Sequence, residues 1–290
     1  MSRTGVAVVL SGGGAKAAAH VGAMKALDER GVKPDRYVAT SMGAVVAACF
    51  ASGMPYEEVL KRMLLLSRRD VARMSPSLVF GPYADSLLRL GVLRRGIGQL
   101  VTARRFTELT VPLTVTAVDV DTGDLVLFGD GGDVEVPLID ALTASCALPV
   151  FYPPLTLRGR RLADGGLRAV LPLEVAASFD PGVMVAVRVG PSFAAVPSEG
   201  GDSGPPLLQA HNRAMRTMMA AQTDRDIATW ADGPIPLIVI EPRIEQAATF
   251  AVRRAITYVE DGYRAAAAAL EHSPYSTRLT GEVSGAAPGS

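Results

Sequence analysis

Residues 6–16 read VAVVLSGGGAK, an apolar run that ends in three consecutive glycines. Residues 37–44 read YVATSMGA, a second apolar run that passes into small, helix-compatible residues at Ser41. Each pattern is typical of a buried strand that turns sharply into a helix. Two such units in succession place parallel strands side by side, so this stretch predicts an α/β fold.

The rest of the chain continues the alternation of strands and helices. Further apolar runs of strand length occupy residues 113–118, 125–128, 183–189 and 236–240. Helical patterns occupy residues 15–30, 42–52, 56–67, 85–93, 138–144, 172–178, 207–230 and 250–270. The turn sequence DTGD at residues 121–124 joins two strands as an antiparallel hairpin. The predicted sheet is therefore central, mixed and mostly parallel.

Length and composition predict one main domain. The chain has 290 residues, 49% of them hydrophobic, which is enough for a large core. We expect the domain to span residues 1–272 and a flexible tail to span residues 273–290, which are rich in Pro, Gly and Ser. Residues 191–206 have a similar composition and predict a surface loop. Residues 74–95 fit either a mobile cap or an irregular connection.

Charge and cysteine content limit the partners and the compartment. Lys plus Arg equals Asp plus Glu at 29 each, so nucleic acid is not an expected partner. The pairs Arg68-Arg69 and Arg94-Arg95 are expected to be solvated surface. Cys49 and Cys146 have neither metal-ligand spacing nor a disulfide framework, which predicts buried free thiols in a reducing compartment.

The apolar runs are too short for a membrane anchor or a signal peptide. About five apolar residues precede Gly12, whereas a bilayer span needs about 20. We therefore expect a cytoplasmic protein, for which peripheral contact with a membrane stays open. The sequence does not indicate an oligomeric state.

The glycine-rich turn at residues 12–14 has three interpretations. A phosphate loop needs G-x-x-x-x-G-K-[ST], and here Lys16 follows Gly14 too soon. A dinucleotide fingerprint is formally present, but the acidic residue it requires should follow the second strand, and Asp35 precedes it. An oxyanion hole remains, because bare amides at a helix N-terminus suit developing negative charge. One glycine suffices for a tight turn, so three favour close approach by a ligand.

Ser41 lies in a near match to the nucleophile elbow G-x-S-x-G. Gly43 occupies the last position of that motif, and Ala39 replaces the first glycine. Taken alone, Ser41 would more often be a helix N-cap. Adjacent parallel strands, however, bring both turns to the same edge of the sheet, where α/β proteins build their sites.

A nucleophilic serine needs a base, and no histidine has the context for that role. His20 lies in the first helix, where packing or a local hydrogen bond is expected; His211 lies in a long helix and His272 at the start of the tail. Asp164 instead lies in the glycine turn ADGG after a short apolar segment. An aspartate in a turn is commonly structural, but paired with Ser41 it would make a Ser–Asp dyad.

These motifs resemble those of patatin-like phospholipases. SGGGAK, TSMGA, ASCALP at residues 144–149 and DGG follow in the order found in that family, across residues 5–270. The resemblance implies a three-layer α/β/α fold and hydrolysis of lipid acyl esters without cofactor or metal. It makes Ser41 the nucleophile and Asp164 the base. It also makes Gly12, Gly13 and Gly14 the oxyanion hole, with Lys16 in the family's basic position. The sequence departs from the family at Ala17 and Ala39, where glycine is usual.

Two other functions stay open at this point. The same fold could carry a non-catalytic regulatory or lipid-binding protein, against which the intact Ser41 and Asp164 argue. A nucleotide-binding oxidoreductase is disfavoured because the ribose-binding acid is missing.

Overall fold

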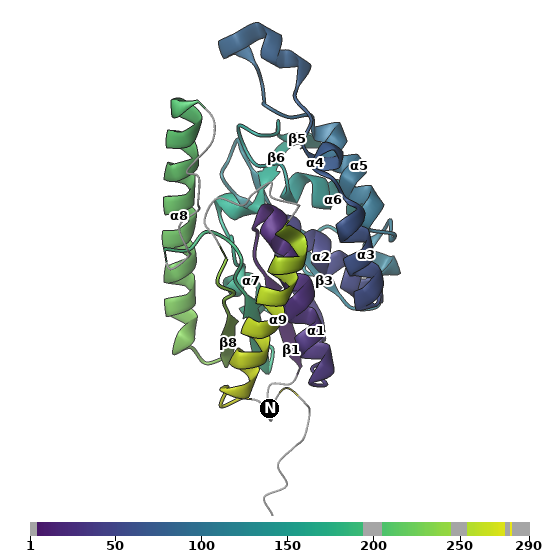
Figure 1. Cartoon of the computed structure of the whole chain (residues 1–290), viewed down its shortest axis with the longest axis vertical. Coiled ribbons are helices and arrows are strands. Elements are labelled where there is room, and N and C mark those ends of the chain that lie inside the picture. The colour runs from purple at the N-terminus through teal and green to yellow at the C-terminus, as the bar shows by residue number, and fades with distance from the viewer. Residues whose placement is uncertain (1–4, 194–204, 245–253, 276–278, 280–290) are drawn as a thin grey trace, which may run out of the picture.

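The structure is a computed structural model that describes residues 5–193, 205–244, 254–275 and 279 (Figure 1). Its centre is an eight-stranded sheet in the order β5-β6-β3-β2-β1-β7-β8, with β4 also paired to β3. The strands are β1 (Val6–Leu10), β2 (Arg36–Thr40), β3 (Leu113–Asp119), β4 (Leu125–Gly129), β5 (Leu155–Leu157), β6 (Arg160–Asp164), β7 (Val183–Val187) and β8 (Leu237–Ile240). Most of the predicted tail and the centre of the predicted 191–206 loop lie outside the described residues.

The sheet is mixed, as the sequence predicts. Strands β1, β2, β3, β7 and β8 run parallel, and the β3–β4 hairpin is antiparallel. Residues of β1 alternate between the two faces: Val8 and Leu10 join one core cluster, whereas Ala7 and Val9 join the other. Both faces are buried, which explains the unbroken apolar runs in the sequence.

Helices cover both faces and make three layers (Figure 1). The larger core lies under α1 (Ala18–Glu29), α2 (Ser41–Ala51), α3 (Tyr56–Leu65), α5 (Leu90–Leu100), α6 (Leu138–Ser145) and α9 (Ala255–Glu271). The opposite face is covered by α7 (Leu173–Ala177) and the long α8 (Pro206–Ala231). This is the expected three-layer α/β/α architecture. No helix of the described part of the chain is both long and apolar enough to cross a membrane.

Helices α1 and α9 cross at two glycines. A Cβ at Gly22 would lie 1.8 Å from the carbonyl oxygen of Val259, and one at Gly262 would lie 1.9 Å from that of Ala19. Only glycine permits so close an approach of two backbones. The last helix of the described chain is thereby packed tightly on the first.

One predicted helix is displaced along the chain, and one hairpin of the structure was not predicted. The helix expected over residues 85–93 is observed as α5, Leu90–Leu100, which contains three glycines that lower helix propensity. One of them, Gly96, is needed because a Cβ there would lie 2.4 Å from the carbonyl oxygen of Asp70. The β5–β6 hairpin is absent from the prediction because arginines interrupt its apolar pattern, and its turn uses positive φ at Arg158 and Gly159.

The most consequential feature of the sheet is the meeting of β2 and β6. Strand β2 pairs with β3 up to Thr40 opposite Thr116, and β6 pairs with β3 from the other direction up to Asp164 opposite Ala117. Since β4 occupies the other side of β3, β2 and β6 share one side and end against each other. The residue after β2 is Ser41, so the register of β3 brings Ser41 and Asp164 together.

Candidate active site

Ser41 occupies a strained turn between β2 and α2. Its φ is 55°, a left-handed conformation that costs a non-glycine residue about 1–2 kcal/mol. A Cβ at Gly43 would lie 2.3 Å from the carbonyl oxygen of Ser11, so the helix can approach β1 only with glycine there. Strain at a functional serine and a close strand–helix crossing are the two features of a nucleophile elbow.

Ser41 and Asp164 are in direct contact. The Ser41 hydroxyl donates to Oδ2 of Asp164 at 2.7 Å, and the Gly166 amide donates to Oδ1 at 2.8 Å. The two residues are only 8% and 5% exposed. Burial raises the pKa of Asp164 to about 6, although both hydrogen bonds act in the opposite direction. A carboxylate so placed is a stronger base than an ordinary aspartate.

Polar side chains from neighbouring elements hold this contact in place. The Ser41 amide donates to Oγ of Ser145 at 2.7 Å. The hydroxyls of Thr40 and Thr116 are 2.7 Å apart, and that of Thr40 also donates to the carbonyl of Ala169. Sequence reasoning did not single out these threonines or Ser145. The only available signal was the position of Ser145 in the ASCALP stretch.

The glycine loop lies against the elbow. A Cβ at Gly12 would be 3.2 Å from Cβ of Ser41, and one at Gly13 would be 2.7 Å from Cγ2 of Val189. The Gly12 amide already donates to the carbonyl of Val170 at 3.0 Å. Among the described residues, the amides of Gly13 and Gly14 donate to no backbone carbonyl. The amide of Gly12 is thus engaged within the fold, and its lack of a side chain lets the loop lie close to Ser41.

Two buried groups fix this loop on its inner side. The hydroxyl of Ser11 accepts from the amides of Val189 and Gly190 at 2.9 and 3.3 Å. His20 is fully buried, and its Nε2 donates to the carbonyl of Ser11 at 2.8 Å. Burial lowers the pKa of His20 to about 4, so the ring is neutral near pH 7. The expected local hydrogen bond of His20 is confirmed.

No hydrogen bond in the described part of the chain joins a histidine to Ser41 or Asp164. His272 bonds the Ala268 carbonyl through Nδ1 at 2.8 Å, and His211 is half-buried in α8. Lys16, the residue in the expected basic position, is 5% exposed and belongs to the short helical turn Gly14–Ala17. Its side chain is thus enclosed beside the glycine loop.

Cys146 borders the Ser41–Asp164 contact. Burial, and then the charge of Asp164, raises its pKa well above the usual value, while a hydrogen bond with Ser41 acts the other way. The thiol stays protonated and does not compete as a nucleophile. Cys146 and Cys49 are both buried free thiols, as predicted.

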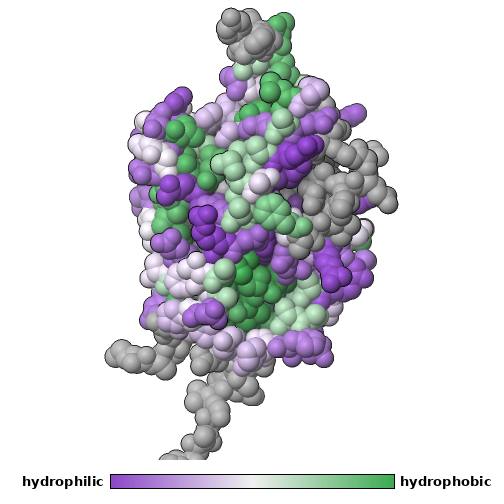
Figure 2. All heavy atoms as spheres, turned by 90° about the vertical axis from the view of Figure 1, so that its left-hand side faces the viewer, coloured by the Kyte–Doolittle hydropathy of each residue, from purple (hydrophilic) through white to green (hydrophobic). Residues whose placement is uncertain are grey.

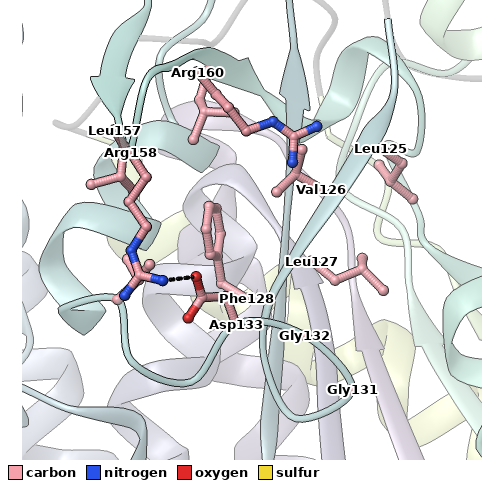
Figure 3. A pocket seen from close by; sticks show the side chains of 12 residues that line it. Leu125, Val126, Leu127, Phe128, Gly131, Gly132, Asp133, Leu157, Arg158 and Arg160 are labelled. Atoms are coloured by element: carbon pink, nitrogen blue, oxygen red, sulfur yellow. Dashed lines mark hydrogen bonds and ion pairs between the residues drawn. The ribbon is translucent and has the colours of Figure 1, made fainter. Parts of the chain in front are cut away.

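A cavity of about 340 Å³ lies between β4 and the β5–β6 hairpin (Figure 3). Phe128, Leu157 and Leu162 contribute apolar walls, and an ion pair of 2.7 Å joins Arg158 to Asp133 at its side. Neither Ser41 nor Asp164 lines it. The cavity is therefore separate from the candidate active site.

Known proteins are similar to this chain over much of its length. A family model described as patatin-like phospholipase matches residues 8–177, which is 170 of the 290 residues. The chain belongs to the patatin-like phospholipase family. Its relatives within this family include an uncharacterized NTE family protein of Mycobacterium tuberculosis, 33% identical over 190 residues, which are 65% of this chain and 50% of that protein.

Other relatives are longer than this patatin-like chain. A second uncharacterized NTE family protein of Mycobacterium tuberculosis is 27% identical, covering 92% of this chain and 46% of its own length. Mouse patatin-like phospholipase domain-containing protein 6 is 28% identical, covering 64% of this chain and 13% of its own. The chain thus spans about half the length of the mycobacterial relatives or less.

Solved structures show weaker similarity. The crystal structure of VipD from Legionella pneumophila has a TM-score of 0.47 at 15% identity and covers 93% of this chain and 67% of that one. Type III effector protein ExoU has a TM-score of 0.40 at 14% identity, covering 96% and 54%. Values this low carry no argument about function.

Proposed function

We propose that this protein is a serine acyl hydrolase that cleaves carboxylic ester bonds of lipids, as a phospholipase A or lysophospholipase-type esterase. The observation that carries the proposal is the 2.7 Å hydrogen bond from Ser41 to the buried Asp164. Membership of the patatin-like phospholipase family supports a lipid substrate.

The first half-reaction would form an acyl-enzyme. Oγ of Ser41 attacks the ester carbonyl carbon while Oδ2 of Asp164 accepts the hydroxyl proton. The amides of Gly13 and Gly14 stabilise the oxyanion, and one such donor contributes roughly 3 kcal/mol in a well-studied hydrolase. As the carbon–oxygen bond to the alcohol breaks, Asp164 returns the proton to the departing alkoxide.

The second half-reaction would release the acyl group. Water gives a proton to Asp164 and attacks the acyl carbon, and Ser41 recovers its proton as the free acid departs. The pKa of Asp164, about 6, suits a base that must be ionised near neutral pH. The neutral His20 takes no part in proton transfer, because its Nε2 is hydrogen-bonded to the Ser11 carbonyl.

We propose that the protein is cytoplasmic and contacts membranes peripherally.

The decisive experiment combines a fluorophosphonate probe with substrate turnover. Native protein should be labelled and should hydrolyse a panel of acyl esters and phospholipids. Ser41→Ala should do neither, whereas Ser145→Ala should still be labelled. Equal labelling of the native protein and Ser41→Ala would refute the assignment of the nucleophile. Labelling without turnover of any ester would favour the lipid-binding or regulatory alternative.

A further inference from the structure

A long arm leaves the body of the protein between α4 (Arg68–Val71) and α5 (Figure 1). We define the arm as residues 74–88. Met74 and Leu88 form an antiparallel bridge at its base, where the Ser75 amide donates to the Leu87 carbonyl at 2.8 Å. Its outer part is the 3₁₀ helix Pro76–Tyr83. The paired base holds the outer part away from the sheet.

Large apolar side chains are exposed on the arm. Val79 is 82% exposed on the outer part of the arm, and Met74 is 62% exposed at its base. Figure 2 shows apolar atoms along the arm at the top of the molecule. Exposed apolar surface that gathers in one place marks an interaction site more often than scattered single residues do.

The same part of the chain is strongly basic. Residues 68–99 contain six arginines, two aspartates and no Lys or Glu, a net charge of +4 (6 − 2). The whole chain is neutral, with 29 residues of each sign. The excess is therefore local, and the fold concentrates it further.

Three of these arginines line one hollow at the base of the arm. Arg69, Arg73 and Arg95 surround a hollow of about 170 Å³ together with Asp70, Val92 and Gln99. Helix α4 meets α5 there at Gly96, which brings one arginine of each sequence pair, Arg69 and Arg95, to the same hollow. Within the described residues, no ion pair involves any of the three guanidinium groups.

The acidic group of the hollow is already bound. The Asp70 carboxylate accepts hydrogen bonds from the amide and hydroxyl of Ser67 at 2.8 and 2.6 Å. The second aspartate, Asp85, accepts from Ser77 within the arm at 2.6 Å. The arginines of the hollow thus remain available to an outside anion, and guanidinium groups suit phosphate well.

We propose that the arm and the arginine hollow dock this protein on an anionic phospholipid bilayer. Val79 on the outer part of the arm enters the interfacial region while Arg69, Arg73 and Arg95 bind lipid phosphates. A nucleic acid or an acidic protein would match the arginines but would leave the exposed Val79 unused. The combination of both features selects a lipid surface.

The arm is attached close to the candidate active site, so docking would orient that site toward the membrane. The amides of Leu87 and Leu88 donate to the carbonyls of Val150 and Phe151 at 2.9 and 2.7 Å. That segment follows Cys146, which borders Ser41 and Asp164. Docking would therefore turn the edge of the sheet that carries the candidate active site toward the lipid. Binding itself needs neither Ser41 nor Asp164, so it is testable separately from the proposed hydrolysis.

The test is co-sedimentation with vesicles, using Ser41→Ala protein so that no lipid is consumed. Vesicles of phosphatidylcholine with phosphatidylglycerol should bind the protein much more strongly than phosphatidylcholine alone. The combined change Arg69→Gln, Arg73→Gln and Arg95→Gln should lower the partition coefficient about a hundredfold, since each arginine near an anionic surface contributes roughly fivefold. Val79→Ser should lower it by about tenfold.

Matched controls change the same residue types elsewhere. Arg104→Gln, Arg105→Gln and Arg225→Gln together remove three exposed arginines outside this region. Val134→Ser removes a valine that is 43% exposed after β4. Neither control should alter binding, and circular dichroism should show all variants folded.

Two results would overturn the proposal: failure of Ser41→Ala protein to bind the anionic vesicles, or equal loss of binding in the control variants. On a Ser41-intact background, the arm variants should still hydrolyse a soluble short-chain ester at the native rate. If no ester is hydrolysed but vesicle binding follows the arm, the docking inference stands and the proposed catalysis fails.

Discussion

Replacing Asp164 by asparagine should make the folding stability less sensitive to pH. Burial raises the pKa of Asp164 from the usual 3.8 to about 6 in the folded protein. As the pH rises from about 4 to 6, the unfolded chain ionises this group while the folded protein keeps it protonated. Stability is therefore lost across that interval, and the loss is complete above the folded pKa.

The size of the effect follows from the two pKa values. They differ by about two pH units, and each unit corresponds to about 1.4 kcal/mol, so ionised Asp164 costs about 3 kcal/mol. Asparagine has nearly the same shape and can still accept from the Gly166 amide, but it does not titrate. The unfolded group is already about half ionised at pH 4, so the free energy of unfolding of Asp164→Asn relative to native protein should rise by roughly 2.5 kcal/mol from pH 4 to pH 8.

Urea unfolding of both proteins at pH 4 and pH 8 measures this difference directly. Asp226, whose pKa burial also raises to about 6, is present in both proteins and cancels in the comparison. Ser41→Ala provides a second check: it removes a hydrogen bond that lowers the pKa of Asp164, so its stability should fall more steeply with pH than that of native protein. If the stability difference between native protein and Asp164→Asn is the same at both pH values, Asp164 titrates normally and the argument for its basicity fails.

Three further predictions concern the reaction and the packing. With a soluble ester, kcat/KM should be level above about pH 6 and fall about tenfold per pH unit below it, because the base must be ionised; a level profile down to pH 5 would contradict this. Gly13→Val, whose side chain would collide with Val189, should slow acylation more than tenfold in protein that urea unfolding shows to be folded under the assay conditions; unchanged turnover of that folded variant would show that the loop is misassigned. Gly262→Ala should cost about 1–3 kcal/mol because it forces α9 away from α1, whereas Gly98→Ala in α5 meets only ordinary contacts and should not destabilise; equal stability of the two variants would exclude the tight crossing.

The central layers of this fold could be predicted from sequence because their signals are local. Unbroken apolar runs such as 6–10 and 183–187 are what a strand buried on both faces requires. The contact between Ser41 and Asp164 could not be predicted from the local hydrophobic pattern alone. It depends on β2 and β6 ending against each other along β3, a register that no local sequence feature encodes.

The crossing of α4 and α5 explains two features that the sequence did not reveal: the position of α5 and the arginine hollow. Helix α5 contains Gly91, Gly96 and Gly98, which propensity counts against a helix, yet Gly96 is required where α4 crosses it. The Arg68-Arg69 and Arg94-Arg95 pairs were predicted to be ordinary solvated surface. Only that tertiary crossing places Arg69 and Arg95 in one hollow.

The place of β1 in the sheet has a consequence for how the chain folds during synthesis. Strand β1 is made first, but one of its two neighbours is β7, at residues 183–187, beyond the 8–177 stretch that matches the family. Until β7 leaves the ribosome, β1 presents an unpaired apolar edge. The face of α1 at Gly22 stays uncovered for longer, because α9 is synthesised after β7. Nascent chains of intermediate length thus carry an edge open to aggregation, and a fragment ending at Ala177 would keep it permanently.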